Sequence, residues 1–152
     1  MDEKEKLAYL AGIIDGEGNI GIYKSTQNKN GSYMATLRIV STDIKLINWL
    51  CVEFDGYYVT QVYSKKYNYS DRHTWELSGR EQYKLLKRIK EYLIIKKEQA
   101  ELNISYYEKV GRWNWRGGRN EGRPIWVKKF QEECYQKSLK LNHRGLCHEQ
   151  PE

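Results

Sequence analysis

Hydrophobic residues recur first at helical and then at strand spacing near the start of the chain. Residues 6–15 carry leucines and isoleucines three to four positions apart, which predicts a helix. Two alternating segments follow at 19–24 and 32–41, and the polar residues 27–31 between them are typical of a turn. The pattern predicts a helix that leads directly into a β-hairpin.

The alternation within residues 32–41 predicts which side of a sheet each residue faces. Small and branched apolar residues form the inner set, whereas the outer set is mixed in character. The inner set is Ala35, Leu37 and Ile39, and the outer set is Met34, Thr36 and Arg38. One face of this hairpin is therefore expected to be buried.

A second helix is predicted after the hairpin, with Thr42 or Asp43 as its N-cap and Asp55-Gly56 as its end. Its apolar positions recur at helical spacing and are Ile44, Ile47, Leu50, Cys51 and Phe54. The two polar candidates for the N-cap stay open at this point.

A second hairpin is predicted from residues 57–64 and 74–78. Trp75 and Leu77 are its expected core residues, so Thr74 and Glu76 should point to the other side. The facing of the strand at 57–63 stays open, because usable side chains occur at both parities. Three helices should follow, at 80–93, 97–110 and 124–141, with Pro124 in a first turn and Gly145 beyond a helix end.

This order of elements predicts an α+β fold with one antiparallel sheet. Helices should cover one face of the sheet and leave the other face for a partner. The 152 residues make one ordinary domain, which buries roughly 70% of its unfolded surface. We expect a core domain over residues 1–110, and a loop and C-terminal helix over 111–152 packed on the same domain.

Composition favours a nucleic-acid partner. The chain has 26 Lys and Arg residues against 20 Asp and Glu, a net charge of +6 and a pI near 9.1, together with 13 tyrosines and 5 tryptophans. Such a surface suits nucleic acid, while charge alone also fits ordinary solvation. The Gly-rich segment 111–123 concentrates the positive charge. Its candidates for phosphate contact are Arg112, Arg116, Arg119 and Arg123, and the alternative is a flexible linker.

The three cysteines, Cys51, Cys134 and Cys147, form no CxxC pair, which favours a reducing interior. His143, Cys147 and His148 lack a fourth convincing ligand, so no zinc site is expected there. The N-terminal residues carry no long apolar stretch. We therefore expect a soluble, intracellular protein with no membrane contact, in a host compartment that the sequence leaves open.

The segment from Leu10 to Gly18 combines small residues with two acids. Residues with little bulk would let a second backbone approach closely, and they are Ala8, Ala11, Gly12 and Gly16. Gly16 and Gly18 are expected to let the chain leave the helix in conformations unfavourable for other residues, so that Glu17 stands at the helix end. A carboxylate there needs a nearby cation, for which magnesium is the natural candidate. The alternative is an ordinary core helix with a Gly-rich stop.

The same segment, Leu-Ala-Gly-Ile-Ile-Asp-Gly-Glu-Gly, resembles the signature of the LAGLIDADG homing endonucleases and occurs once. The resemblance implies the α-β-β-α-β-β-α homing endonuclease fold, with a saddle-shaped sheet on the DNA major groove and a C-terminal helical extension. The motif helices of two subunits would meet through Leu7, Ala8, Leu10, Ala11, Gly12 and Asp15. Asp15 is expected to hydrogen-bond the helix-to-strand turn rather than to perform chemistry.

The resemblance also implies a catalytic set. Glu17 of both subunits and the Gly16 carbonyl would hold Mg²⁺, with Mn²⁺ as a substitute and Ca²⁺ as an ion that binds without cleavage. Lys96 matches the lysine that the family places near the scissile phosphate, with Lys97 as a close competitor. Ser41 would belong to a water network, and Lys45 would be an active-site cation. General phosphate attraction or solvation fits each lysine about as well.

By the same resemblance, outward-facing residues of the sheet would read bases. They are Asn19, Tyr23, Ser25, Met34, Thr36, Arg38, Thr60, Thr74 and Glu76. Arg38 is the best single candidate, because a guanidinium can donate two hydrogen bonds to a guanine edge. An ordinary polar sheet surface is the alternative for each.

These features predict a homodimeric, magnesium-dependent, site-specific endonuclease that cuts double-stranded DNA at a long, nearly palindromic site. A LAGLIDADG intron RNA-splicing maturase and a non-cleaving DNA-binding regulator remain open, because one scaffold can serve several functions. Intron RNA is a partner only under the first of these alternatives. A purely structural dimerisation module is disfavoured by the positive charge.

Overall fold

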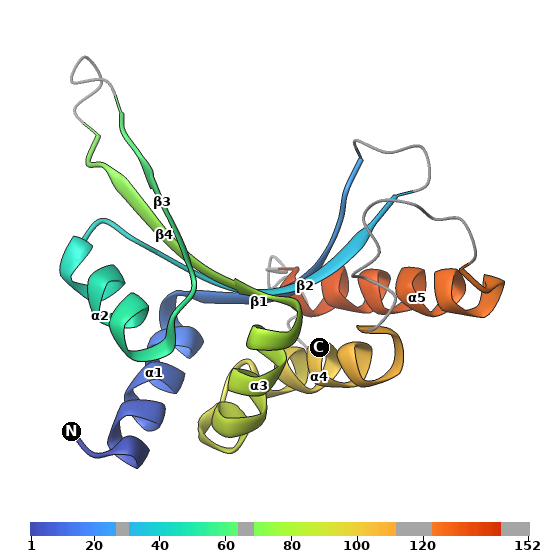
Figure 1. Ribbon diagram of the computed structural model, residues 1–152, viewed down its shortest axis with the longest axis horizontal. Helices are drawn as coiled ribbons and strands as arrows, with labels where there is room; N and C mark the ends of the chain where they lie inside the picture. The colour runs from blue at the N-terminus through green and yellow to red at the C-terminus, as the bar shows by residue number, and fades with distance from the viewer. Residues whose placement is uncertain (27–30, 64–68, 112–122, 144–152) are drawn as a thin grey trace, which may run out of the picture.

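The computed structural model describes residues 1–26, 31–63, 69–111 and 123–143 (Figure 1). The helices in these residues are α1 (Glu3–Glu17), α2 (Ile44–Phe54), α3 (Gly79–Ile89), the short 3-10 helix η2 (Lys90–Tyr92), α4 (Lys97–Val110) and α5 (Ile125–Asn142). The strands are β1 (Gly18–Lys24), β2 (Tyr33–Ser41), β3 (Tyr57–Gln61) and β4 (Arg72–Ser78). The predicted α+β class and the predicted order of elements are confirmed.

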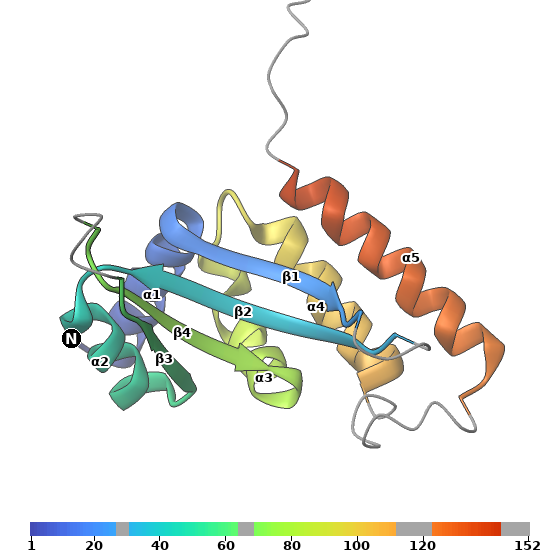
Figure 2. The same ribbon diagram turned by 90° about the horizontal axis from the view of Figure 1, so that it is seen from above.

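The four strands form one antiparallel sheet in the order β1-β2-β4-β3. Both hairpins rise from the middle of the sheet, which gives the saddle shape of Figure 1. The helices lie beneath this saddle, and the view from above in Figure 2 shows the strands uncovered. Among the described residues, nothing forms a layer over the concave face of the sheet.

Strand register fixes the residues on this uncovered side, which we call the open face. Asn19 pairs with Arg38, Arg38 with Glu76, and Glu76 with Tyr57, so one row crosses all four strands. Alternation from this row gives the remaining members of the open face. They are Tyr23, Met34, Thr36, Val40, Val59, Gln61, Arg72, Thr74 and Ser78.

Register also decides the facing of β3, which the sequence left open. Thr60 pairs with His73, and its Oγ1 lies 3.0 Å from the His73 Nδ1. Since His73 alternates with Thr74, Thr60 faces the helices, and its prediction as an outward residue is wrong. Val59, which pairs with Thr74, takes that place on the open face.

The core lies between the sheet and the helices. Ala35, Leu37 and Ile39 are fully buried, as the alternation of β2 predicts, and so are Trp75 and the α2 residue Ile47. Ile44, expected among the apolar positions of α2, is exposed at the helix start instead. Cys51 is half-buried against this core, and burial raises the pKa of its thiol.

Helix α5 covers the outer edge of β1 with side chains rather than with another strand. The Ser138 Oγ accepts a hydrogen bond from the Ile22 amide at 2.9 Å, and the Asn142 amide donates to the Ile20 carbonyl at 2.9 Å. Lys24 also forms a 2.8 Å ion pair with Glu132 of α5. Two backbone groups on the edge of β1 are thereby satisfied, and the helix stands where a foreign strand would pair.

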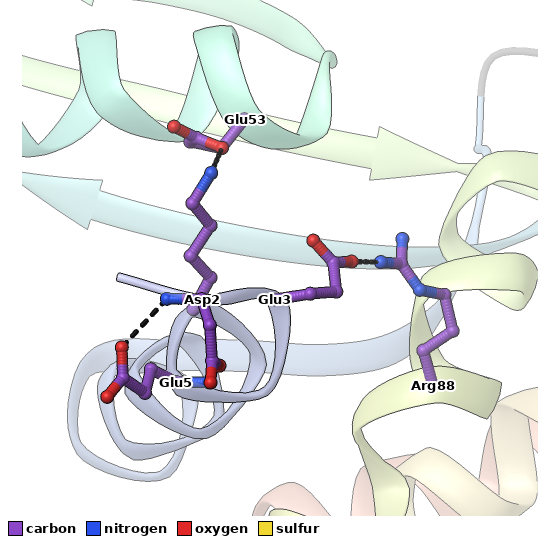
Figure 3. A network of polar contacts seen from close by, with 6 residues as sticks. Asp2, Glu3, Glu5, Glu53 and Arg88 are labelled. Carbon is purple, nitrogen blue, oxygen red and sulfur yellow. Dashed lines mark hydrogen bonds and ion pairs between the residues drawn. The ribbon is translucent and has the colours of Figure 1, made fainter.

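Helix α1 is tied at its N-terminal half to two neighbouring helices. Asp2 accepts from the Glu5 amide at 2.9 Å while Glu5 accepts from the Asp2 amide at 2.7 Å, a capping box that starts the helix earlier than residue 6. Figure 3 shows Glu3 beside Arg88 of α3, with which it forms an ion pair. On the other side, Lys6 pairs with Glu53 of α2 at 2.5 Å.

Other boundaries differ modestly from the sequence patterns. The helix expected at 80–93 ends at Ile89, and η2 continues the chain through Tyr92. Strand β3 ends at Gln61, short of residue 64, whereas β4 begins at Arg72, two residues before the predicted start. The longer β4 adds one charged residue to the open face.

The contact between α5 and the edge of β1 yields a first prediction. We expect Ser138→Ala to lower the free energy of unfolding by about 1–3 kcal/mol, because the buried Ile22 amide loses its acceptor. Urea unfolding measures the change. Ser105→Ala, at an exposed position of α4, is the matched control and should change stability by about 0.5 kcal/mol or less. Equal effects of the two substitutions would contradict the role given to Ser138.

Candidate functional site

The last turn of α1 brings Gly16 and Glu17 to the surface at the start of β1. Gly18 has φ −80° and ψ 162°, which is ordinary extended backbone, and φ is not positive at Gly16 either. The expectation that these glycines supply unusual backbone angles is therefore wrong. A Cβ on Gly18 would lie 2.7 Å from the Ile14 Cα, so space requires this glycine.

Asp15 fastens the end of α1 to the segment before α4. Its carboxylate accepts hydrogen bonds from the backbone amides of Ile94 at 2.8 Å, Ile95 at 3.2 Å and Lys96 at 2.9 Å. Burial opposes ionisation of this carboxyl, but the three amides and the Lys96 charge together lower its pKa below the usual value. The prediction that Asp15 hydrogen-bonds the turn between α1 and β1 is wrong, because its carboxylate accepts from the segment before α4 instead.

Lys96 supplies the cation that the carbonyl end of α1 requires. Its Nζ donates to the carbonyl oxygens of Ile14 and Asp15, each at 2.7 Å. No basic residue stands in the last turn of α1 itself, so the compensating charge comes from a distant part of the chain. Lys97, the competing candidate, instead pairs with Glu91 at 3.1 Å.

Glu17 lines an open pocket of about 670 Å³ where α1 meets the ends of β2 and β4. Ser41, Thr42 and Arg72 supply its other polar groups, and Val40 and Leu46 its apolar ones. Ser41, which the resemblance assigns to a water network, lines the same pocket as Glu17, and its Oγ accepts from the Asp43 amide at 3.0 Å.

Lys45 does not line the pocket of Glu17. Asp43 caps α2 by accepting from the Lys45 amide at 2.8 Å, which settles the N-cap. The Lys45 side chain lines a separate pocket with Tyr9 and Trp49. The role of active-site cation is therefore not supported for Lys45 within one chain.

Sequence reasoning missed Arg72. The alternating pattern of the return strand of the second hairpin predicts a start at Thr74, which places Arg72 in the connecting stretch. Extending the same outward parity from Glu76 and Thr74 by one step reaches this arginine. That parity is the signal that could have identified it.

Arg38 is already engaged on the open face. Its Nε lies 2.7 Å and its terminal nitrogen 2.6 Å from one oxygen of Glu76, and the guanidinium lies 5.2 Å from the centre of the Tyr23 ring. Tyr23 in turn donates to the Asn19 Oδ1 at 2.8 Å. Four predicted base-reading residues therefore form one polar network.

The other predicted base-reading residues differ in accessibility. Met34 is exposed, and Thr74 and Ser25 are half-buried. Thr36 lies on the open face but is only 3% exposed, and its Oγ1 has no hydrogen-bond partner among the described residues. Direct contact between Thr36 and a base would need neighbouring side chains to move.

The motif helix α1 presents two distinct sides. Leu7, Leu10 and Ala11 are buried in the core of the chain, so these three predicted interface residues have packing partners within it. Ala8, Gly12 and Gly16 form an exposed stripe at spacings of four residues, which we call the small-residue stripe. A Cβ on Gly12 or Gly16 would meet nothing within 4 Å, so packing against the described part of the chain does not explain these glycines.

The arginines predicted to contact phosphate are described only in part. Arg112, Arg116 and Arg119 fall outside the described residues, as does Cys147, whereas Arg123 lies just before α5 with a terminal nitrogen 3.5 Å from the Gln131 Oε1. Within the described ranges no group of three or more His, Cys, Asp and Glu could hold a metal ion. None of the helices described is both long and apolar enough to span a membrane.

No family model and no curated protein matches the sequence. Solved structures do match the fold. The homing endonuclease I-CvuI in complex with its target aligns over 88% of this chain and 94% of its own, at 17% identity and a TM-score of 0.60. The archaeal intron-encoded homing endonuclease I-Vdi141I complexed with DNA aligns over 98% of this chain and 91% of its own, at 13% identity and a TM-score of 0.74.

A third structure is similar to the chain over part of its own length. The LAGLIDADG meganuclease I-AabMI bound to uncleaved DNA aligns over 89% of this chain but 47% of its own, at 19% identity and a TM-score of 0.62. The chain therefore has the fold of the LAGLIDADG homing endonucleases, as its motif implies.

The two adjacent lysines provide a second prediction. Lys96→Met should lower the free energy of unfolding by about 1–3 kcal/mol, because two carbonyls at the end of α1 lose a charged donor. Lys97→Met is the matched control and should cost about 0.5 kcal/mol or less, since its ion pair with Glu91 is exposed. Chemical denaturation of both variants tests this difference. Similar losses at the two positions would exclude a special role of Lys96 in fixing α1.

Proposed function

We propose that this chain, which has the fold of the LAGLIDADG homing endonucleases and carries their motif once, is a homodimeric, site-specific endonuclease of that family. It cuts double-stranded DNA at a long, nearly palindromic site and depends on a divalent metal ion. The position of Glu17 is the observation that carries the proposal. It is the exposed acid of the motif, and it lines a polar pocket beside the open face.

The two acids of the motif have separate roles in this proposal. The Asp15 carboxylate is engaged by three backbone amides and holds α1 in place. The Glu17 carboxylate is left for chemistry, and Gly16 beside it is exposed as well. Oxygen ligands of this kind suit Mg²⁺, which keeps several waters and binds few carboxylates.

The donor set fits a metal shared between two chains. Glu17 and the Gly16 carbonyl of one chain would supply at most a few oxygens, and a second copy would supply the same set. Bound there, a divalent ion would stabilise negative charge at a phosphate and lower the pKa of a bound water. The chain's own contribution is to hold Glu17 at the end of α1, through the bonds from Asp15 and Lys96.

The surface of α1 supports a second copy as the partner. The small-residue stripe lets another helix backbone approach closely, and two copies related by a twofold axis would meet through the same surface. Exposed apolar residues lie near this stripe. Ile94 and Ile95 are 88% and 70% exposed, and their backbone amides donate to Asp15 at the end of α1. Burial of this apolar surface would favour association.

The open face supports duplex DNA as the substrate. It is concave, and the contacts of Arg38 with Glu76 and Tyr23 restrict its side chain, so less entropy is lost when its guanidinium engages a base. Arginine donates bidentately to guanine in the major groove, and Glu76 can accept from cytosine. The I-CvuI, I-Vdi141I and I-AabMI structures were solved with DNA, and one I-CvuI structure was solved in the presence of magnesium. We extend a DNA partner and a divalent metal to this chain by that likeness.

Cleavage by a Glu17 variant tests the proposal. The protein is incubated with Mg²⁺ and a pooled DNA library of intron-insertion sequences, and every new end is sequenced. We expect recurrent ends at one long site with the unaltered protein, and loss of these ends with Glu17→Gln or after chelation by EDTA. Glu17→Gln should keep its DNA affinity with Ca²⁺ present. Undiminished cleavage by Glu17→Gln would overturn the catalytic assignment.

The same preparation separates the alternative functions. An intron RNA-splicing maturase would prefer structured intron RNA over duplex DNA in a gel-shift competition, and a regulator would bind one duplex tightly without cutting it. We expect preference for DNA together with cleavage. Preference for intron RNA, or DNA binding with no Glu17-dependent ends, would replace the endonuclease proposal by the corresponding alternative.

The proposed homodimer has its own test. Gly12→Leu should leave the fold of one chain intact, because a Cβ there meets nothing within 4 Å, but it should weaken the dimer at least about tenfold by overpacking the helix contact. Sedimentation velocity across a concentration series measures this change, and cleavage should fall with dimer content. Glu101→Leu on the exposed side of α4 is the control. A dimer of unchanged affinity in Gly12→Leu would exclude contact through the small-residue stripe.

A further inference from the structure

Arg72 is the one basic residue among the described residues that line the pocket of Glu17. It stands at the first position of β4, pairs with Gln61, and shares the open face with Thr74 and Glu76. Its position is therefore set by the sheet rather than by a loop. Arg72 and Glu17 therefore line the same polar pocket, one from the start of β4 and the other from the end of α1.

The neighbouring cations are committed to other partners. Lys96 binds the carbonyls at the end of α1, Lys97 pairs with Glu91, and Arg38 pairs with Glu76. Lys45 lines a different pocket. For Arg72 the described part of the chain offers neither an ion pair nor a side-chain hydrogen bond, and the residue is exposed. Its positive charge is thus available to an anion that enters the pocket.

Phosphate oxygens are the anions that such a guanidinium recognises best. Arginine donates two parallel hydrogen bonds to a phosphate and keeps its charge at any working pH. The pocket also places hydroxyl groups of Ser41 and Thr42 near the same space. One pocket therefore has a carboxylate for a metal from Glu17 at the end of α1 and a guanidinium for a phosphate from Arg72 at the start of β4.

We propose that Arg72 binds the scissile phosphate and stabilises the negative charge that builds up on its oxygens during hydrolysis. This inference rests on the proposed endonuclease function. In that reaction the oxygen of a water forms a bond to phosphorus, the bond from phosphorus to the 3′ oxygen breaks, and one water proton ends on the departing 3′ oxygen. Arg72 transfers no proton. Its contribution is electrostatic, and it grows as charge develops in the transition state.

The test compares Arg72→Met and Arg72→Lys with Arg80→Met, a control at an exposed position of α3 outside the open face. The duplex is the one recovered from the pooled library, by cleavage or, where no cleavage occurs, by binding selection in Ca²⁺. Single-turnover cleavage at saturating protein reports the chemical step. The salt dependence of equilibrium binding in Ca²⁺ reports the number of phosphate contacts.

We expect Arg72→Met to slow single-turnover cleavage by about 10²–10³-fold, as loss of one charge-stabilising donor does. Arg72→Lys should recover part of that loss, and Arg80→Met should cleave like the unaltered protein. In binding, the slope of log K against log salt should fall by about one for Arg72→Met. Replacing the scissile phosphate with a neutral methylphosphonate should abolish this difference in slope between Arg72→Met and the unaltered protein.

Failures of the two proposals give different results. Cleavage by Arg72→Met within about threefold of the unaltered rate, while Glu17→Gln is inactive, would overturn the role of Arg72 and leave the endonuclease proposal standing. Absence of cleavage by the unaltered protein would overturn the endonuclease proposal. The binding measurement then decides whether Arg72 contacts phosphate, because an unchanged salt slope in Arg72→Met would exclude that contact.

Discussion

The candidate site depends on the hydrogen bonds between Asp15 and the segment before α4. Asp15 accepts from three backbone amides of that segment, and Lys96 of the same segment donates back to two carbonyls of α1. Carbonyl groups left over at the C-terminal end of α1 are thereby satisfied from a part of the chain some eighty residues away. With this end fixed, Glu17 stands at the edge of the open face rather than against the core.

Local patterns were sufficient for the framework. The alternation of Ala35, Leu37 and Ile39 with the mixed outer set predicted the buried side of β2, because one face of this strand meets a helix layer and the other does not among the described residues. The capped helical pattern after Asp43 predicted α2, and the helix at 97–110 was predicted with its observed ends. The nine-residue motif added the fold by resemblance, which periodicity alone would not have supplied, and the role that we propose for Glu17 comes from the same resemblance.

Local sequence patterns did not predict the contacts between segments that are distant in the chain. Thr60 was assigned to the wrong side because the parity of β3 depends on its pairing with β4, and no local feature fixes that register. The cation at the end of α1 is a lysine of another element, although the motif alone suggested only a metal. Arg72 was missed because a strand boundary was placed two residues late. Gly18 was expected to allow an unusual backbone angle. The structure instead requires a glycine there because a Cβ would collide with Ile14, a contact that the sequence alone does not reveal.

Helix α1 passes into β1 without an intervening loop, since Glu17 is the last helical residue and Gly18 the first of the strand. The outer side of α1 and the open face are therefore parts of one continuous unit. In the proposed homodimer one duplex would contact the open faces of both subunits, so DNA binding and assembly would favour each other. Thermodynamic linkage makes that bias reciprocal: whatever factor the target adds to the affinity between subunits, dimerisation adds to the affinity for the target. At low protein concentration the dimer would then form mainly on its target DNA. DNA that matches only one half-site would stabilise the dimer poorly.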